Sequence, residues 1–129
     1  LEAIQNIKEQ QLEDQIEIHH DDALTFDIND LKYQEFDCLF IDAAKAQYQK
    51  FFEKYMPLSS KNGICIVDNL DFMGWFLILI ILKIEIQNNL LKKLKEFKDW
   101  IFNHEEYQVT YYGIGDGICV IKRKWNKCH

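Results

Sequence analysis

Two short apolar runs, each ending in a carboxylate, constrain this 129-residue chain more than any other feature. Residues 38–41, Cys-Leu-Phe-Ile, end at Asp42, and residues 64–67, Ile-Cys-Ile-Val, end at Asp68 and Asn69. A run that is apolar on both faces is typical of a parallel strand covered by helices on each side. The sequence therefore predicts that residues 37–42 and 64–67 form adjacent parallel strands of an α/β sheet.

The rest of the chain alternates helix and strand patterns around these two runs. Alternation of this kind predicts a mostly parallel sheet, and an Asp-Gly pair between two strand patterns near the end predicts an antiparallel hairpin. The expected elements are a helix over residues 1–13, a strand over 16–20, a helix carrying Tyr48, Phe51, Phe52, Tyr55 and Met56 and ended by Pro57, a long helix with Leu90, Leu94, Phe97 and Ile101 on one stripe, and two strands joined at Asp116-Gly117.

Polar side chains at the strand ends point to a binding site. Open parallel sheets bind ligands at the carboxyl ends of their strands, where Asp42, Asp68 and Asn69 would converge. Carboxylate and amide oxygens suit Mg²⁺. Lys45 would sit beside such a cation, which lowers the pKa of a lysine and lets it act as a base. On pattern alone a second interpretation stays open, in which Asp42 caps a helix and Asp68-Asn69 starts a turn.

Charge and cysteine content limit the other function classes. A net charge of -6 argues against a general nucleic-acid binder held by a basic surface. The four cysteines show no CxxC spacing, which predicts a reducing, cytoplasmic compartment and neither zinc nor disulfides. The longest apolar stretch covers residues 73–82, just before Lys83. It is too short to span a bilayer, so no membrane partner is expected.

Three segments together resemble one enzyme family. "FDCLFIDAAKAQYQKFFEKYMPL", "GICIVDNL" and "IGDGICVIK" are similar to the bacterial cation-dependent O-methyltransferases, relatives of the catechol and caffeoyl-CoA O-methyltransferases that include the tRNA 5-hydroxyuridine methyltransferases. The resemblance runs from residue 1 to about 72 and from about 90 to 124. It implies a Rossmann-like class I methyltransferase sheet without its first strands, with residues 1–129 forming the carboxy-terminal portion of a single S-adenosylmethionine-dependent domain.

The resemblance also implies roles for individual residues. In the family, the acid of "IDAAK" and the "DN" pair bind a divalent metal, and the lysine is catalytic. The family's Gly-Asp-Ala turn lies against the adenine of S-adenosylmethionine, and here Asp21 replaces its glycine, which would cost fit if that position needs a positive φ. The implied set is Lys45 as the catalytic residue, Asp22, Ala23 and Asp42 at the cofactor, and Asp42, Asp68 and Asn69 at Mg²⁺ or another divalent cation.

The implied reaction is metal-assisted methyl transfer to a hydroxyl oxygen. The acceptor would be a catechol-like phenol or the 5-hydroxyuridine at the wobble position of a tRNA, because each offers two adjacent oxygens to a cation. The sequence does not decide between them, and a homodimer is left open.

Two departures from the family pattern support a rival hypothesis. The family's glycine-rich loop, first strand and ribose-binding acid precede the helix at which this chain begins. Met73 replaces a histidine, and the apolar stretch 75–82 replaces a polar one, as an altered reading frame would explain. We expect this stretch to be poorly accommodated or to cover surface that the missing amino-terminal part would bury. The rival is a non-catalytic fragment that cannot bind S-adenosylmethionine alone.

Overall fold

The computed structural model describes residues 1–43, 45–68 and 89–124. The chain divides into two compact units, Leu1–Gln34 and Glu35–His129. The assignment of residues 1–129 to part of a single domain stays a prediction. Asn69 and the apolar stretch 75–82 lie outside the described residues.

The first unit contains one α-helix and one short 3-10 helix. Helix α1 (Glu2–Glu9) confirms the predicted helix but ends earlier, where Gln11 takes a positive φ of 55°. The 3-10 helix η1 (Ile28–Asp30) is capped by the carboxylate of Asp27, which accepts a hydrogen bond from the amide of Asn29 at 2.9 Å.

The predicted strand over residues 16–20 is wrong. The segment is not part of any described strand, although its alternating pattern suits one. A strand needs a neighbour for its backbone hydrogen bonds, and Leu1–Gln34 contains only helix α1 and the 3-10 helix η1 besides this segment. Its contacts are made by side chains, since the carboxylate of Glu17 accepts from the amide of Lys32 at 3.1 Å and the ring of His19 lies against Phe26.

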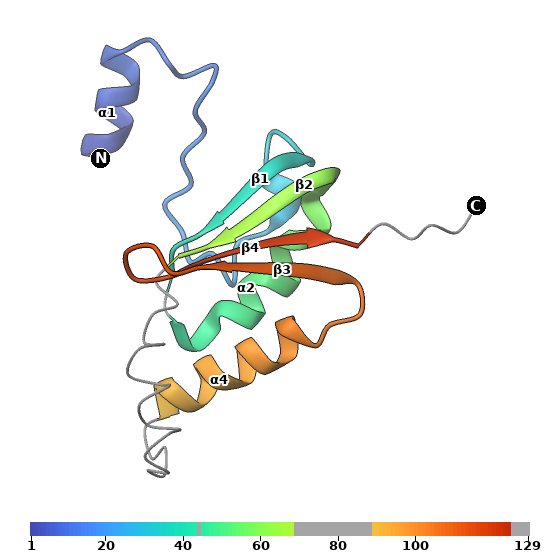
Figure 1. The fold of residues 1–129 in the computed structure, drawn as a ribbon. Helices are drawn as coiled ribbons and strands as arrows, with labels where there is room; N and C mark the ends of the chain where they lie inside the picture. Colours follow the sequence, from blue (N-terminus) through green and yellow to red (C-terminus); the bar gives the residue numbers. More distant parts are fainter. Residues whose placement is uncertain (44, 69–88, 125–129) are drawn as a thin grey trace. The chain divides into compact units, whose positions relative to one another are not determined.

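The second unit is built on a four-stranded sheet with the order β1-β2-β4-β3 (Figure 1). Strands β1 and β2 are parallel, as predicted, and β4 pairs antiparallel with both β2 and β3. The turn before β4 contains Gly117, whose φ of 83° favours glycine. The bounds are β1 Phe36–Ile41, β2 Ser59–Val67, β3 Tyr107–Tyr112 and β4 Ile118–Arg123.

Strand β2 begins at Ser59, five residues before the predicted start at Ile64. The apolar run gave no sign of this earlier start, but Ser59 pairs with Phe36 across a register shift in β1. The hydroxyl of Ser60 donates to the carboxylate of Asp37 at 2.7 Å. Arg123 at the end of β4 binds the start of β2 and the preceding η3. Its guanidinium donates to the carbonyl oxygens of Met56, Ser59 and Ser60 at 2.9, 2.9 and 3.1 Å.

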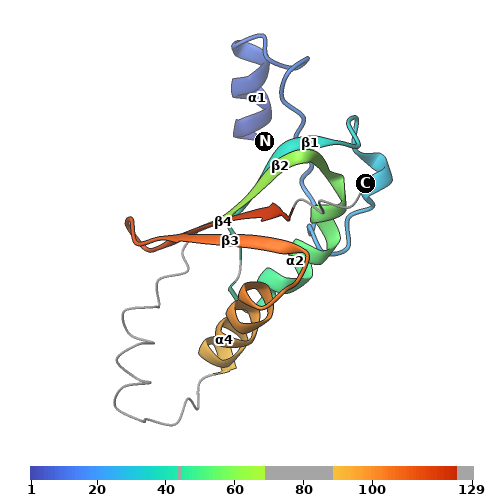
Figure 2. The same ribbon diagram turned by 45° about the vertical axis from the view of Figure 1, so that its right-hand side comes forward.

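Two α-helices cover one face of this sheet, as Figures 1 and 2 show. Helix α2 (Tyr48–Tyr55) follows the 3-10 helix η2 (Lys45–Gln47) and leads into η3 (Met56–Leu58), and α4 (Asn89–Phe102) packs beside it. The predicted stripe on α4 is confirmed for Leu94, Phe97 and Ile101, which are buried. Phe52 joins the layers, since its ring meets Trp100 and Tyr107 edge-on at 5.7 and 5.0 Å.

The opposite face of the sheet is more exposed than its composition predicts. Phe40 is 61% exposed, and Cys38 beside it is also exposed. Phe40 pairs with Ile66, which pairs with Val120, so an apolar row crosses three strands. The expectation that both faces of β1 are covered is therefore wrong for the second unit as described, because the covering helices lie on one side. In the described parts of the chain, no helix has the length and apolar character needed to cross a membrane.

Candidate functional site

The sheet brings the two predicted carboxylates to neighbouring positions. Ile41 and Val67 are paired in the parallel register of β1 and β2, and Asp42 and Asp68 are the next residues of their strands. The side chain of Asp42 is exposed and that of Asp68 is half-buried. The strand pairing that the metal-site hypothesis requires is confirmed.

The backbone of Asp68 is fixed from two sides. Its amide donates to the carbonyl oxygen of Ile41 at 3.2 Å, which extends the β1–β2 ladder one residue beyond the assigned strands. Its carbonyl oxygen accepts a hydrogen bond from the hydroxyl of Tyr48 at 2.8 Å. The end of β2 is thereby attached both to β1 and to the first turn of α2.

The carboxylates of Asp42 and Asp68 both act on the hydroxyl of Tyr48. Burial raises the pKa of Tyr48 to about 12, and the negative charges of Asp42 and Asp68 add to the effect. Both charges must lie near this hydroxyl to do so. Tyr48 thus stays protonated at neutral pH, and its hydroxyl remains a donor.

Of two further predicted residues, one is described in part and the other not at all. Lys45 begins η2, three residues after Asp42, but the structure describes its backbone alone. Asn69 follows Asp68 and lies outside the described residues. Within the described ranges, no group of three or more His, Cys, Asp or Glu side chains is arranged to hold a metal ion. The predicted set of metal ligands contains two residues of these types, Asp42 and Asp68, together with Asn69. Both carboxylates offer the hard oxygen donors that Mg²⁺ prefers.

Asp22 and Ala23, the predicted cofactor contacts, lie in a turn of the first unit. The carboxylate of Asp22 accepts a hydrogen bond from the amide of Leu24 at 2.8 Å, and the amide of Asp22 donates to the carboxylate of Asp21 at 2.8 Å. Asp21 does not have a positive φ, since among the described non-glycine residues only Gln11 does. The replacement of glycine by Asp21 therefore causes no backbone strain here.

The sequence interpretation missed Tyr48 as a site residue. Its helical spacing with Phe52 and Tyr55 assigned it to the core, and it is indeed only 1% exposed. The available signal was the position of Tyr48, three residues after Lys45. A tyrosine at the start of the helix that follows β1 can reach the end of β2 with its hydroxyl.

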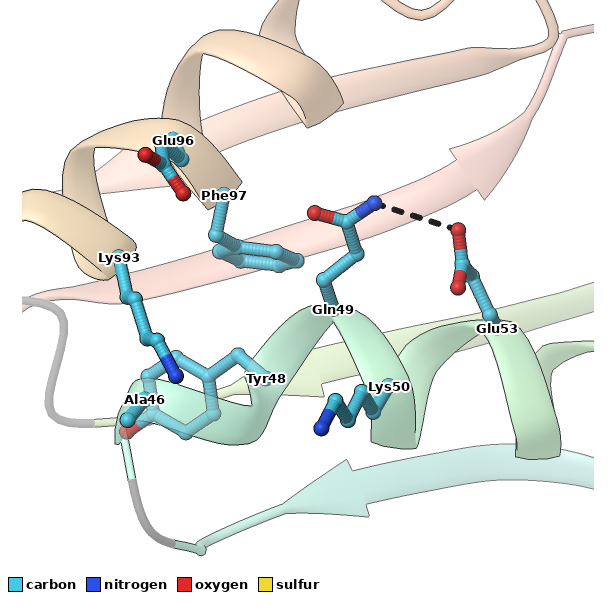
Figure 3. Close-up of a pocket in the computed structure, with 8 residues that line it drawn as sticks. All are labelled: Ala46, Tyr48, Gln49, Lys50, Glu53, Lys93, Glu96 and Phe97. Carbon is cyan, nitrogen blue, oxygen red and sulfur yellow. Dashed lines mark hydrogen bonds between the residues drawn. The ribbon is translucent and has the colours of Figure 1, made fainter.

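A cavity of about 320 Å³ is lined by residues of α2 and α4, Tyr48 and Phe97 among them (Figure 3). Figure 3 shows Lys93 reaching toward Tyr48 at one end. At the other end, the side-chain amide of Gln49 donates a hydrogen bond to the carboxylate of Glu53 at 3.3 Å. Two lysines and two glutamates line the cavity. Their charges balance, so the lining favours neither anions nor cations.

Comparison with known proteins identifies relatives of this chain. Residues 2–124 match the family model for O-methyltransferases. Tapetum-specific methyltransferase 1 of Arabidopsis thaliana is 31% identical over 93 residues, which make up 70% of this chain and 39% of that protein. This chain thus spans about four tenths of that curated relative.

Two solved structures share the fold. A candidate caffeoyl-CoA O-methyltransferase from Staphylococcus aureus is 31% identical, with a TM-score of 0.77 over 95% of this chain and 58% of that one. An O-methyltransferase from Bacillus cereus, solved in complex with SAH, is 25% identical, with a TM-score of 0.72 over 95% of this chain and 56% of that one. The likeness confirms the predicted Rossmann-like α/β sheet with its antiparallel terminal hairpin.

Proposed function

Because this chain belongs to the O-methyltransferase family, we propose that it transfers a methyl group from S-adenosylmethionine to a hydroxyl oxygen with the help of a divalent cation. One observation carries the proposal. Asp42 and Asp68 follow paired positions of adjacent parallel strands, at the edge of the sheet where such folds bind ligands.

Asp42, Asp68 and Asn69 would hold the cation. Two carboxylates and one amide oxygen leave room for further oxygen ligands, which suits Mg²⁺. When bound, the cation would supply Lewis acidity and a template for two adjacent oxygens of the acceptor.

We assign Lys45 the role of general base. Lys45 comes three residues after Asp42, at the start of η2, and would accept the proton of the acceptor hydroxyl. Bound S-adenosylmethionine would supply the methyl group, whose bond to sulfur would break as its bond to the acceptor oxygen forms.

The cofactor would contact Asp22, Ala23 and Asp42. The Bacillus cereus relative was solved in complex with SAH, which supports S-adenosylmethionine as the methyl donor here. For the acceptor we retain two classes that chelate in the same way, a catechol-like phenol and the 5-hydroxyuridine of a tRNA.

The second candidate function is that of a non-catalytic fragment. Calorimetric titration of the 129-residue chain with S-adenosylmethionine, with and without Mg²⁺, separates the two. The enzyme proposal expects saturable binding, whereas heats of dilution alone would support the fragment.

Two substitutions test the assigned roles in a methyl-transfer assay with a catechol acceptor. Asp42→Ala should weaken the response to Mg²⁺, and excess Mg²⁺ should restore part of the rate. Lys45→Ala should lower the rate roughly 10²–10⁴-fold without rescue by Mg²⁺, and higher pH should recover part of it. Lys50→Ala, which removes an exposed lysine of α2, is the matched control. Full activity of Lys45→Ala at neutral pH would show that Lys45 is not the base.

A further inference from the structure

We propose that Tyr48 is a positioning residue for the cation site, which holds the backbone of Asp68 so that its carboxylate stays beside Asp42. The inference rests on the proposed cation site and adds a residue to it. Tyr48 would not touch the cation; it acts through Asp68.

The first argument is the hydrogen bonding of Asp68. Its amide is bound to the carbonyl of Ile41, and its carbonyl is bound by the hydroxyl of Tyr48 at 2.8 Å. Both peptide groups that flank the Asp68 side chain are therefore held, which limits rotation of the backbone at the point from which the carboxylate projects. A ligand held in this way loses less conformational freedom when it binds a cation.

The second argument is the rigidity of Tyr48. Its side chain is 1% exposed, and its ring meets Phe97 of α4 edge-on, with centroids 5.8 Å apart. Figure 3 shows Tyr48 at the start of α2, with Phe97 projecting from the neighbouring helix. The hydroxyl is consequently carried by a side chain that two helices hold in place.

The third argument concerns what the hydrogen bond connects. Tyr48 lies 20 residues before Asp68, so the bond joins the crossover helix between β1 and β2 to the end of β2. Asp42 precedes that helix and Asp68 follows it. Loss of the hydroxyl would release the end of β2 from α2, although the strand pairing remains.

Tyr48→Phe is the direct test, because it keeps the ring and removes only the hydroxyl. Residues that orient metal ligands typically contribute 10–100-fold to metal affinity, and we expect Tyr48→Phe to weaken Mn²⁺ binding by about this factor. The measurement is the Mn²⁺ dissociation constant of the 129-residue chain by electron paramagnetic resonance, with urea unfolding of each variant in parallel.

Tyr107→Phe is the matched control. Tyr107 is also partly buried, but its ring packs against Phe52 and His104 in another part of the core. We expect this variant to bind Mn²⁺ like the wild type. A merely structural role of Tyr48 predicts that both variants lose stability and that neither loses affinity for Mn²⁺.

The outcomes separate this inference from the function on which it rests. If the wild type binds no Mn²⁺, the cation site and the inference both fail. If the wild type binds Mn²⁺ and Tyr48→Phe binds it equally well, the inference alone fails.

Should Tyr48→Phe not fold, 3-fluorotyrosine placed at position 48 alone keeps the hydroxyl and reports on the cation through its fluorine resonance. Bound Mn²⁺ should broaden this signal far more than the same label at position 107. Equal broadening at the two positions would overturn the inference.

Discussion

Arg123 is the only arginine among the 15 basic residues of the chain, and we predict that it contributes more to stability than any of its lysine neighbours. Its guanidinium donates three hydrogen bonds to the carbonyl oxygens of Met56, Ser59 and Ser60, where η3 passes into β2. The carbonyls belong to residues more than 60 positions earlier in the chain. Removal of the side chain would leave them without this donor.

The expected magnitude follows from the number and type of these bonds. A hydrogen bond to a charged group contributes about 1.5–3 kcal/mol when it is shielded, but the three share one half-exposed guanidinium and do not add fully. We expect Arg123→Ala to lower the free energy of unfolding by about 2–4 kcal/mol. Arg123→Lys keeps the charge but cannot reproduce the planar fork, so a loss of about 1–2 kcal/mol is expected.

Urea unfolding followed by circular dichroism measures these losses. The matched control is Lys122→Ala, because Lys122 is the adjacent residue of β4 and is exposed; its effect should stay within about 0.5 kcal/mol. The reasoning would be refuted if Arg123→Ala were no more destabilising than Lys122→Ala, or if Arg123→Lys matched the wild type.

Four further predictions concern the core, a turn and the thiols. Phe52→Ala removes a fully buried ring and should cost about 3–5 kcal/mol in urea unfolding, and a loss below 1 kcal/mol would contradict the packing described. Gly117→Ala places a side chain at a φ of 83° and should cost about 1–2 kcal/mol by thermal unfolding, whereas an unchanged midpoint would argue against that backbone conformation. Burial raises the pKa of the Cys65 thiol to about 12 from an ordinary 9.0, so the unfolded state loses this proton first and stability should fall as the pH rises from about 9 toward 12. In a Cys128→Ser background, a thiol reagent at pH 8 should modify the exposed Cys38 and spare Cys65 until the chain unfolds, and rapid labelling of Cys65 would show that it is not buried.

The sequence predicted the elements whose signal is local and strong. The apolar runs that end at Asp42 and Asp68 identified two parallel strands and their pairing. A short, continuous apolar run is typical of a parallel strand. The stripe of α4 and the Asp-Gly signal of the hairpin were equally direct.

Features that depend on partners distant in the chain were not predictable in this way. Residues 16–20 have the alternation of a strand, but alternation does not supply the neighbour that a strand requires. The early start of β2 depends on the pairing of Ser59 with Phe36 across a register shift, which no local pattern encodes. Tyr48 resembled any other buried aromatic residue until its hydroxyl was seen to meet the carbonyl of Asp68.

The place of β4 in the sheet has a consequence for the order of folding. It follows β1, β2 and β3 in the chain, yet it lies between β2 and β3 and bonds to both. During synthesis the parallel pair and its crossover helix can assemble first, whereas β3 has no place in the sheet until residues 118–123 have emerged from the ribosome. Until then the edge of β2 that later pairs with β4 has unpaired backbone groups. A nascent chain halted before residue 118 would be prone to association through that edge.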